Sequence, residues 1–269
     1  MVKSRLASRL SASRRAAVEP APRGLPRALE RRALNLQIWS LPIAALALCT
    51  GNPAAAQVSG AIAVESDFRL RGLSMSAGRP VASLRLGLDD ESGVYASGSA
   101  TAVLTRGEDP RFLAYQVGGG IAKRVGHFWT VDFGIAHNEI RAAYDGGYPY
   151  TYTELYAGAT RAPFSAYVFV SPNYFRSDFW TVYGQLEASV SPAENWHLTA
   201  HVGSLNYVDT PPQYTVRRKS LYDWRLGVTR EIGNLEIHAA LTGGGPGRQY
   251  YYGASHSKTA IVAGASLSF

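Results

Sequence analysis

Charged side chains recur in this sequence at a spacing of two residues. Asp67, Arg69 and Arg71 follow this spacing, and Asp223 and Arg225 repeat it. Residues two apart in an extended strand point to the same face, so each set shares one face. Opposed carboxylates and guanidinium groups create a transverse electric field that orients dipolar solutes. We therefore hypothesise that these charges form a constriction if their face lines a channel.

A hydrolytic site would instead require a nucleophile within reach of a base. The candidate pairs are His256 with Ser257, His201 with Ser204, and His137 with Asn138. No recognisable motif supports any of them. His197 and His201 share a strand face but lie about 13 Å apart at roughly 3.3 Å per residue, too far to share a metal ion. The sequence therefore predicts no enzyme, metal site or cofactor, and an outer-membrane lipid hydrolase is the least favoured alternative.

The elements that must position these residues are short strands with a two-residue hydrophobic period. Between residues 180 and 190, even positions are apolar or glycine, while odd positions carry polar side chains or a tyrosine. Segments of this kind predict twelve strands. They span 58–71, 80–88, 94–104, 112–124, 128–138, 151–161, 164–172, 179–191, 196–207, 220–230, 235–242 and 258–269.

The connections between these strands alternate in length. Five are short, at 89–93, 125–127, 162–163, 192–195 and 231–234, and the six between them are mostly longer. This alternation predicts an all-β protein, a transmembrane antiparallel up-and-down β-barrel with short periplasmic turns and longer extracellular loops. Ten or fourteen strands are the alternatives if a weak segment, 80–88 or 164–172, is misjudged. A secreted lipocalin-like barrel is the soluble alternative, and it would turn its apolar face inward.

The faces of the strands then assign the lumen. With the apolar face toward lipid, seven acidic and six basic side chains face inward, and this near balance predicts no ion preference. The reverse orientation would cost about 2 to 4 kcal/mol for each Arg or Lys at the membrane midplane. The predicted pore-lining residues are Asp67, Arg69, Arg71, Arg85, Glu154, Glu187, Asp223, Arg225 and Lys258. Alternatively, these residues pair with one another and neutralise a narrow, partly filled lumen.

Aromatic residues near the strand ends predict how the barrel meets the membrane. Side chains of this kind form girdles at both membrane interfaces of outer-membrane barrels. The predicted girdle residues are Trp129, Trp180, Trp196, Trp224 and Tyr222. The last strand alternates apolar residues up to Leu267 and Phe269, which we interpret as the signal read by the barrel-assembly machinery. The expected partners are this machinery, outer-membrane lipid, lipopolysaccharide and small hydrophilic solutes.

The N-terminal segment predicts export. Residues 1–56 hold 9 Lys and Arg against 2 Asp and Glu, so residues 57–269 are neutral and nucleic-acid binding is not expected. A long basic region precedes an apolar run of 14 residues at 38–51, short of the roughly 20 that cross a bilayer as a helix. Ala54 and Ala56 supply a small-x-small cleavage motif. We therefore predict a signal peptide cleaved after Ala56, followed by the barrel at 57–269.

Three segments carry a resemblance that covers the whole predicted mature chain. They are residues 66–74 (SDFRLRGLS), 152–158 (YTELYAG) and 222–228 (YDWRLGV). These segments resemble the TorF family of porin-like proteins, although that family usually has Tyr in place of Phe68 and an aromatic residue in place of Leu70. The resemblance implies an outer-membrane porin-like barrel without a defined substrate.

Together these patterns predict a passive porin-like channel for small hydrophilic solutes in the outer membrane of a Gram-negative bacterium. The alternative is a non-conducting barrel with a structural or partner-binding role through its external loops.

Overall fold

The computed structural model describes residues 57–209, 220–245, 250–251 and 254–269. The predicted signal peptide, residues 1–56, lies outside the described residues. No helix in the described part of the chain is long and apolar enough to span a membrane.

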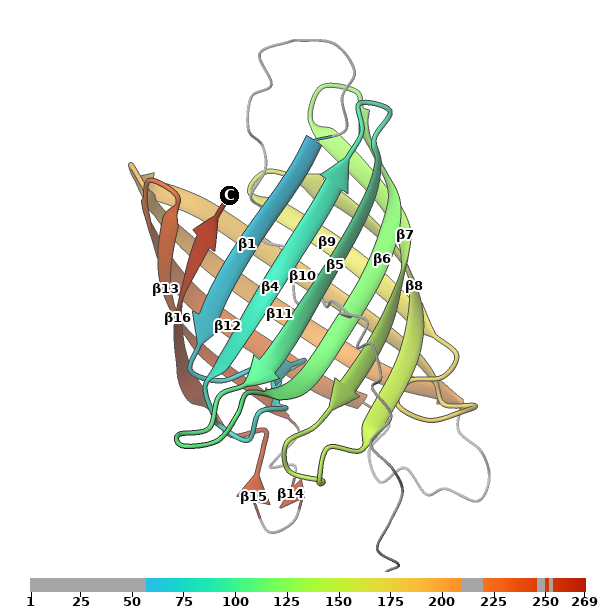
Figure 1. Cartoon of the computed structure of the whole chain (residues 1–269). Coiled ribbons are helices and arrows are strands. Elements are labelled where there is room, and N and C mark those ends of the chain that lie inside the picture. The colour runs from blue at the N-terminus through green and yellow to red at the C-terminus, as the bar shows by residue number, and fades with distance from the viewer. Residues whose placement is uncertain (1–56, 210–219, 246–249, 252–253) are drawn as a thin grey trace, which may run out of the picture. The chain divides into compact units, whose positions relative to one another are not determined.

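Twelve antiparallel strands form a closed barrel, which confirms the predicted fold class and strand count. The barrel strands are β1 (Gln57–Glu65), β4 (Val81–Asp89), β5 (Val94–Val103), β6 (Arg111–Val125), β7 (Trp129–Arg141), β8 (Pro149–Arg161), β9 (Phe164–Ser171), β10 (Trp180–Ala193), β11 (Trp196–Asp209), β12 (Ser220–Ile232), β13 (Leu235–Gly245) and β16 (Ala260–Ser268). Sequence neighbours pair around the wall, and β1 closes the barrel against β16 (Figure 1). Both weak segments, 80–88 and 164–172, are barrel strands.

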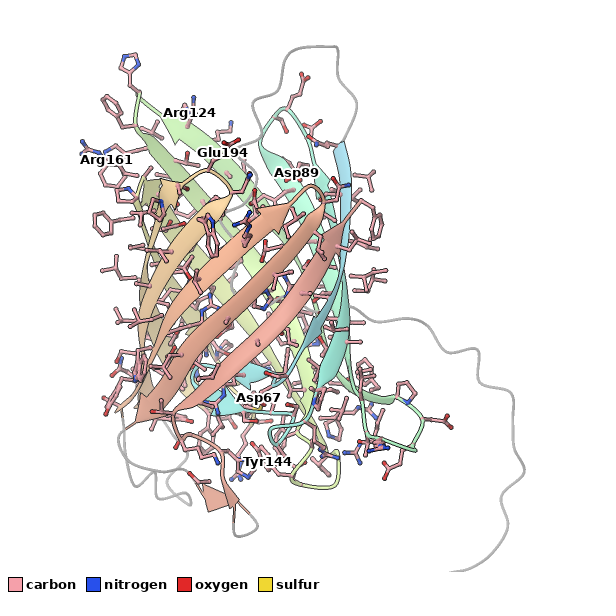
Figure 2. All side chains as sticks on the ribbon, turned by 90° about the vertical axis from the view of Figure 1, so that its left-hand side faces the viewer. Asp67, Asp89, Arg124, Tyr144, Arg161 and Glu194 are labelled. Carbon is pink, nitrogen blue, oxygen red and sulfur yellow. The ribbon has the colours of Figure 1, made fainter. Side chains whose placement is uncertain are left out.

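The two ends of the barrel differ. The turns at 90–93, 126–128, 162–163, 194–195 and 233–234 lie at one end, here named the turn end. The longer connections lie at the other end, the loop end. Figure 2 shows Asp89, Arg124, Arg161 and Glu194 at the turn end, and Asp67 and Tyr144 at the loop end. The alternation of short and long connections in the sequence therefore separates the two ends in space.

Residues 66–80 leave the barrel wall, so the predicted first strand at 58–71 is too long. The wall strand β1 ends at Glu65, and the chain then makes a small hairpin of β2 (Arg69–Leu70) and β3 (Leu73–Ser74) before β4 begins. Its tight turn places Arg71 at φ 47° and Gly72 at φ 77°, in the left-handed region that extended strands do not use. We name residues 66–80 the inner segment. Its departure from the wall is local, and β1 keeps its pairing with β4 up to Glu65.

The inner segment builds a hydrophobic core inside the loop end of the barrel. Phe68, Leu70 and Met75 are buried, and Met75 is only 1% exposed. They pack against inward side chains of the surrounding strands and loops: Val81, Val103, Leu113, Ala114, Ile140, Ala142, Tyr152, Tyr174, Tyr183 and Leu205. A second small hairpin, β14 (Tyr250–Tyr251) with β15 (Ala254–Ser255), lies at the same end (Figure 1).

The outer face of the barrel is apolar. Large exposed hydrophobic side chains alternate with inward-facing ones, as in β1, where Ile62 is 52% exposed and Ala63 is 2% exposed. The same alternation runs along β10, where Leu186 is 48% exposed and Glu187 is 9% exposed. An apolar outer wall with polar inward residues is the arrangement of a barrel surrounded by lipid.

Candidate functional site

The inner segment is held in shape by the Asp67 carboxylate. Its Oδ1 accepts hydrogen bonds from Ser74 Oγ at 2.6 Å and Ser76 Oγ at 2.8 Å, and its Oδ2 pairs with Arg69 Nε at 2.7 Å. Arg69 Nη1 also donates to the backbone oxygen of Lys258 at 2.9 Å. Asp67 is 7% exposed, so its charge is compensated within the hairpin.

Arg71 joins the inner segment to the opposite wall. Its Nη2 pairs with Glu154 Oε1 of β8 at 2.6 Å, and both side chains are nearly buried, at 10% and 6% exposure. The guanidinium carbon lies 4.0 Å from the ring centroid of Tyr183 and 4.9 Å from that of Tyr174. An Arg within about 6 Å of an aromatic face gains a cation–π attraction. Arg71 Nη1 nevertheless has no hydrogen-bond partner among the residues that the structure describes.

A network of polar side chains extends from this arginine across three strands. The Tyr183 hydroxyl donates to the Asp223 carboxylate at 3.1 Å. His201 lies between Asp223, with Nε2 at 2.8 Å, and Glu187, with Nδ1 at 3.2 Å. The network therefore connects the Arg71 contact to β10, β11 and β12.

A second network lies on the other side of the barrel around Asp132. The carboxylate accepts hydrogen bonds from Tyr95 at 2.8 Å and from Tyr167 at 3.3 Å, and the Tyr95 hydroxyl also bonds the Tyr156 hydroxyl. Asp132 takes part in none of the ion pairs among the described residues, although it is only 6% exposed. Within the described part of the chain, its carboxylate is therefore stabilised by tyrosine hydroxyls and not by a cation within 4 Å.

The tyrosine rings lie against the wall because glycines on adjacent strands make room for them. A Cβ added at Gly134 would be 2.3 Å from the Tyr156 hydroxyl, and one added at Gly158 would be 2.2 Å from the Tyr167 ring. The inward tyrosines therefore occupy the space that a side chain at Gly134 or Gly158 would need.

Inward polar side chains are more exposed away from the filled loop end. His238 lies 3.4 Å from Glu65, the last residue of β1, and 3.5 Å from Glu236, near the turn end of β13. These three side chains are 20%, 22% and 37% exposed. Arg85 is 30% exposed and lies 4.0 Å from Glu65. These exposures are at least twice those of Arg71 and Glu154, at 10% and 6%. The lumen is therefore polar and partly exposed outside the loop end, and it is filled at the loop end.

The predicted pore-lining residues separate into two groups. Asp67, Arg69, Arg71, Arg85, Glu154, Glu187 and Asp223 all lie inside the barrel in the contacts described above, and Arg225 faces inward with no ion pair within 4 Å among the described residues. Lys258 lies in the connection before β16 with an exposed side chain. A role of these residues in conduction stays a prediction.

The predicted girdle and terminal residues face outward. Trp129, Trp180, Trp196 and Tyr222 are between 38% and 53% exposed, Trp224 is partly exposed, and Leu267 and Phe269 are 52% and 66% exposed. Arg161 lies 5.7 Å over the Trp129 ring and Arg230 lies 4.9 Å over the Trp196 ring, both at the turn end. Their roles in membrane anchoring and assembly stay predictions.

The candidate hydrolytic residues have other contacts. His201 is engaged by Glu187 and Asp223, and His137 bonds Thr153 at 2.9 Å. His256 is buried, with its ring centroid 4.0 Å from that of Tyr144. Within the described ranges, no group of three or more His, Cys, Asp or Glu is placed to hold a metal ion.

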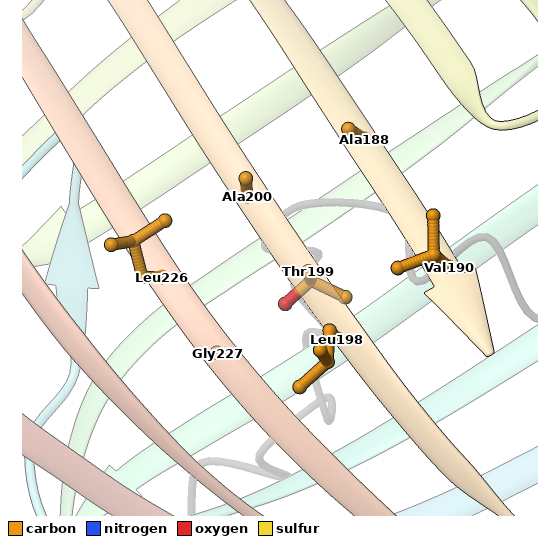
Figure 3. Close-up of a pocket in the computed structure, with 7 residues that line it drawn as sticks. All are labelled: Ala188, Val190, Leu198, Thr199, Ala200, Leu226 and Gly227. Atoms are coloured by element: carbon orange, nitrogen blue, oxygen red, sulfur yellow. The ribbon is translucent and has the colours of Figure 1, made fainter. Parts of the chain in front are cut away.

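An apolar depression of about 290 Å³ lies on β10–β12 and is separate from the lumen. Figure 3 shows its lining residues, Ala188, Val190, Leu198, Thr199, Ala200, Leu226 and Gly227. Val190, Leu198 and Leu226 are 48%, 43% and 56% exposed on the outer face. The depression therefore opens toward lipid.

Comparison with solved structures supports the fold. The chain is similar to the NanC porin at 12% identity and a TM-score of 0.55, with 78% of this chain and 99% of that chain covered. It also matches the KdgM porin (8% identity, TM-score 0.49, 78% and 99% covered) and outer membrane phospholipase A from Escherichia coli (13%, 0.46, 78% and 92%). At these identities the likeness shows only the fold, a porin-like outer-membrane barrel. This conclusion rests on the NanC match.

Comparison with protein families places the chain in one of them. No curated protein matches the sequence. The resemblance to the TorF family is not confirmed. A family model described as a bacterial protein of unknown function (Gcw_chp) matches residues 50–265, and the chain belongs to this Gcw_chp family.

Proposed function

We propose that this protein is a porin-like passive channel for small hydrophilic solutes in the bacterial outer membrane, and that the inner segment closes its loop end in the conformation described here. The observation that carries the proposal is the charged, partly exposed lumen outside the filled loop end, where Arg85, Glu236 and His238 are 20% to 37% exposed. Burying ionisable groups without solvent is costly, so a barrel with a purely structural interior would favour apolar side chains there.

The inner segment can act as a closure because it is attached at both ends but paired with the wall at few points. Ser74 N donates to His256 O and Ala143 N donates to Met75 O, each at 2.8 Å. The Arg71–Glu154 ion pair supplies the contact with β8. Breaking these contacts would free the hairpin without opening the barrel ladder, since β1 and β4 remain paired on either side of it.

Planar-bilayer conductance tests the channel. We expect the full chain, extracted from the outer membranes of a Gram-negative host and checked for folding by a heat-dependent gel shift, to give unitary current steps that boiling abolishes. A variant lacking residues 69–75 should conduct more, because the hairpin that fills the loop end is gone.

A second candidate function is a non-conducting barrel that acts through its external loops. The specific observation that favours it is the hydrophobic core that fills the loop end. This alternative predicts silence from both the full chain and the variant lacking 69–75, although both insert and show the gel shift. Current from the shortened variant alone would instead identify a channel that the inner segment keeps closed.

A further inference from the structure

The apolar depression on the outer wall has the form of a site for one hydrocarbon chain. Two alanines, Ala188 and Ala200, line it beside the larger side chains of Val190, Leu198 and Leu226 (Figure 3). The small side chains create the hollow, and the larger ones form its sides. Since all five side chains are apolar, an acyl chain would contact only apolar surface in the depression.

A positive charge lies at the turn-end edge of the depression. Trp196 precedes the lining residue Leu198 by two positions on the same outer face, and it pairs across the ladder with Arg230. Four residues separate Trp196 from Ala200, about 13 Å at roughly 3.3 Å per residue. Arg230, which stacks on Trp196, therefore lies next to the depression on the outer face of β11 and β12.

Arg230 is free to bind an anion. Its side chain is exposed and lies 4.9 Å over the Trp196 ring, and it forms none of the ion pairs found within the described residues. The adjacent acid, Glu231, faces the other way and pairs with His197 at 3.1 Å. An unpaired guanidinium suits a phosphate oxygen, which it can contact with two parallel N–H groups.

Arg141, an outward arginine at the loop end, is already neutralised. Arg141 also lies near an aromatic ring, 5.5 Å from Phe112, but its Nε donates to Glu139 at 2.7 Å. Arg161, at the turn end, lies 5.7 Å over Trp129 and has no ion pair among the described residues. Of the three outward arginines Arg141, Arg161 and Arg230, Arg230 is the one next to the depression and without an ion pair among the described residues.

We propose that this face binds one anionic glycerophospholipid, with an acyl chain in the depression and the phosphate on Arg230. The site rests on the proposed outer-membrane location, with the turn end toward the periplasm, and it is independent of conduction. The Trp196 ring borders the lipid at the level where the headgroup meets the acyl chains, as interfacial tryptophans do.

Native mass spectrometry of the full chain, extracted in detergent and titrated with dioleoylphosphatidylglycerol, tests the site. We expect one lipid to bind more tightly than the rest. Arg230→Gln should weaken this first binding about tenfold, equivalent to ~1.4 kcal/mol. Ala200→Phe should weaken it similarly by filling the hollow.

Arg161→Gln is the matched control, because it removes a turn-end arginine stacked on tryptophan but away from the depression. It should leave the first binding unchanged. Equal binding by all variants, or an equal loss in Arg161→Gln, would overturn the proposal. A barrel dimer that Ala200→Phe dissociates would also overturn it, since a second copy would then cover the depression.

The lipid-binding test and the conductance test can fail independently of each other. A barrel that conducts but binds no lipid tightly contradicts only the lipid site, while a silent barrel that binds one lipid contradicts only the channel.

Discussion

Arg71 joins the inner segment to the β8–β10 wall through an ion pair with Glu154. Removing one partner of a buried ion pair leaves the other charge uncompensated, at a typical cost of about 3 to 5 kcal/mol. We therefore expect both Arg71→Ala and Glu154→Gln to loosen the inner segment and raise the conductance or the open time of single channels.

Arg79→Ala is the control for this effect, since Arg79 is also in the inner segment but donates only to the backbone oxygens of Ser76 and Ala143. It should change the current much less. Unchanged current in Arg71→Ala, measured on folded barrels, would show that this arginine does not hold a closure.

On the β5–β9 side, inward tyrosine side chains pack directly over glycines of adjacent strands. Gly134→Ala should destabilise the barrel by about 1 to 3 kcal/mol, the usual range for overpacking, because the new methyl group would meet the Tyr156 hydroxyl and backbone of β6. Urea unfolding in lipid vesicles would measure the loss. Gly184→Ala is the matched control, since nothing lies within 4 Å of its added Cβ. Equal stability of the two variants would mean that the tyrosine ring moves aside without cost.

The lumen as a whole is more acidic than its composition predicts. Arg69 and Arg71 are neutralised by Asp67 and Glu154, and Lys258 is exposed beyond the wall. The remaining inward acids are Glu65, Asp132, Glu187, Asp223, Glu231 and Glu236, against Arg85, Arg124 and Arg225. An open channel should therefore favour cations, which differs from the absence of preference that the sequence predicts.

Reversal potentials in a KCl gradient measure this preference, using the variant lacking 69–75 if the full chain is closed. We expect a potential of the sign for K⁺ selectivity, and a smaller one for Glu187→Gln. A potential near zero, or of the opposite sign, would show that the three inward histidines compensate the acids.

The sequence by itself determined the wall of this protein. The two-residue period is a local property, because successive side chains of a strand point to opposite faces whatever the partner strand is. That property placed Glu187, Asp223 and Arg85 inside and Trp180 and Leu267 outside. The connection lengths then predicted the two ends of the barrel. Together, the period and the connection lengths predicted all twelve wall strands.

Only the tertiary structure decided what fills the lumen. Arg71 and Glu154 are 83 residues apart, and no local pattern pairs them. The alternation through Asp67, Arg69 and Arg71 is the same for a wall strand and for the inner segment. Three features distinguish the inner segment from a wall strand. They are the turn at Arg71 and Gly72, the serine hydrogen bonds to Asp67, and the burial of Phe68 and Met75. These contacts exist only once the barrel has closed around them, because closure alone brings β4, β8 and β10 within reach of one hairpin.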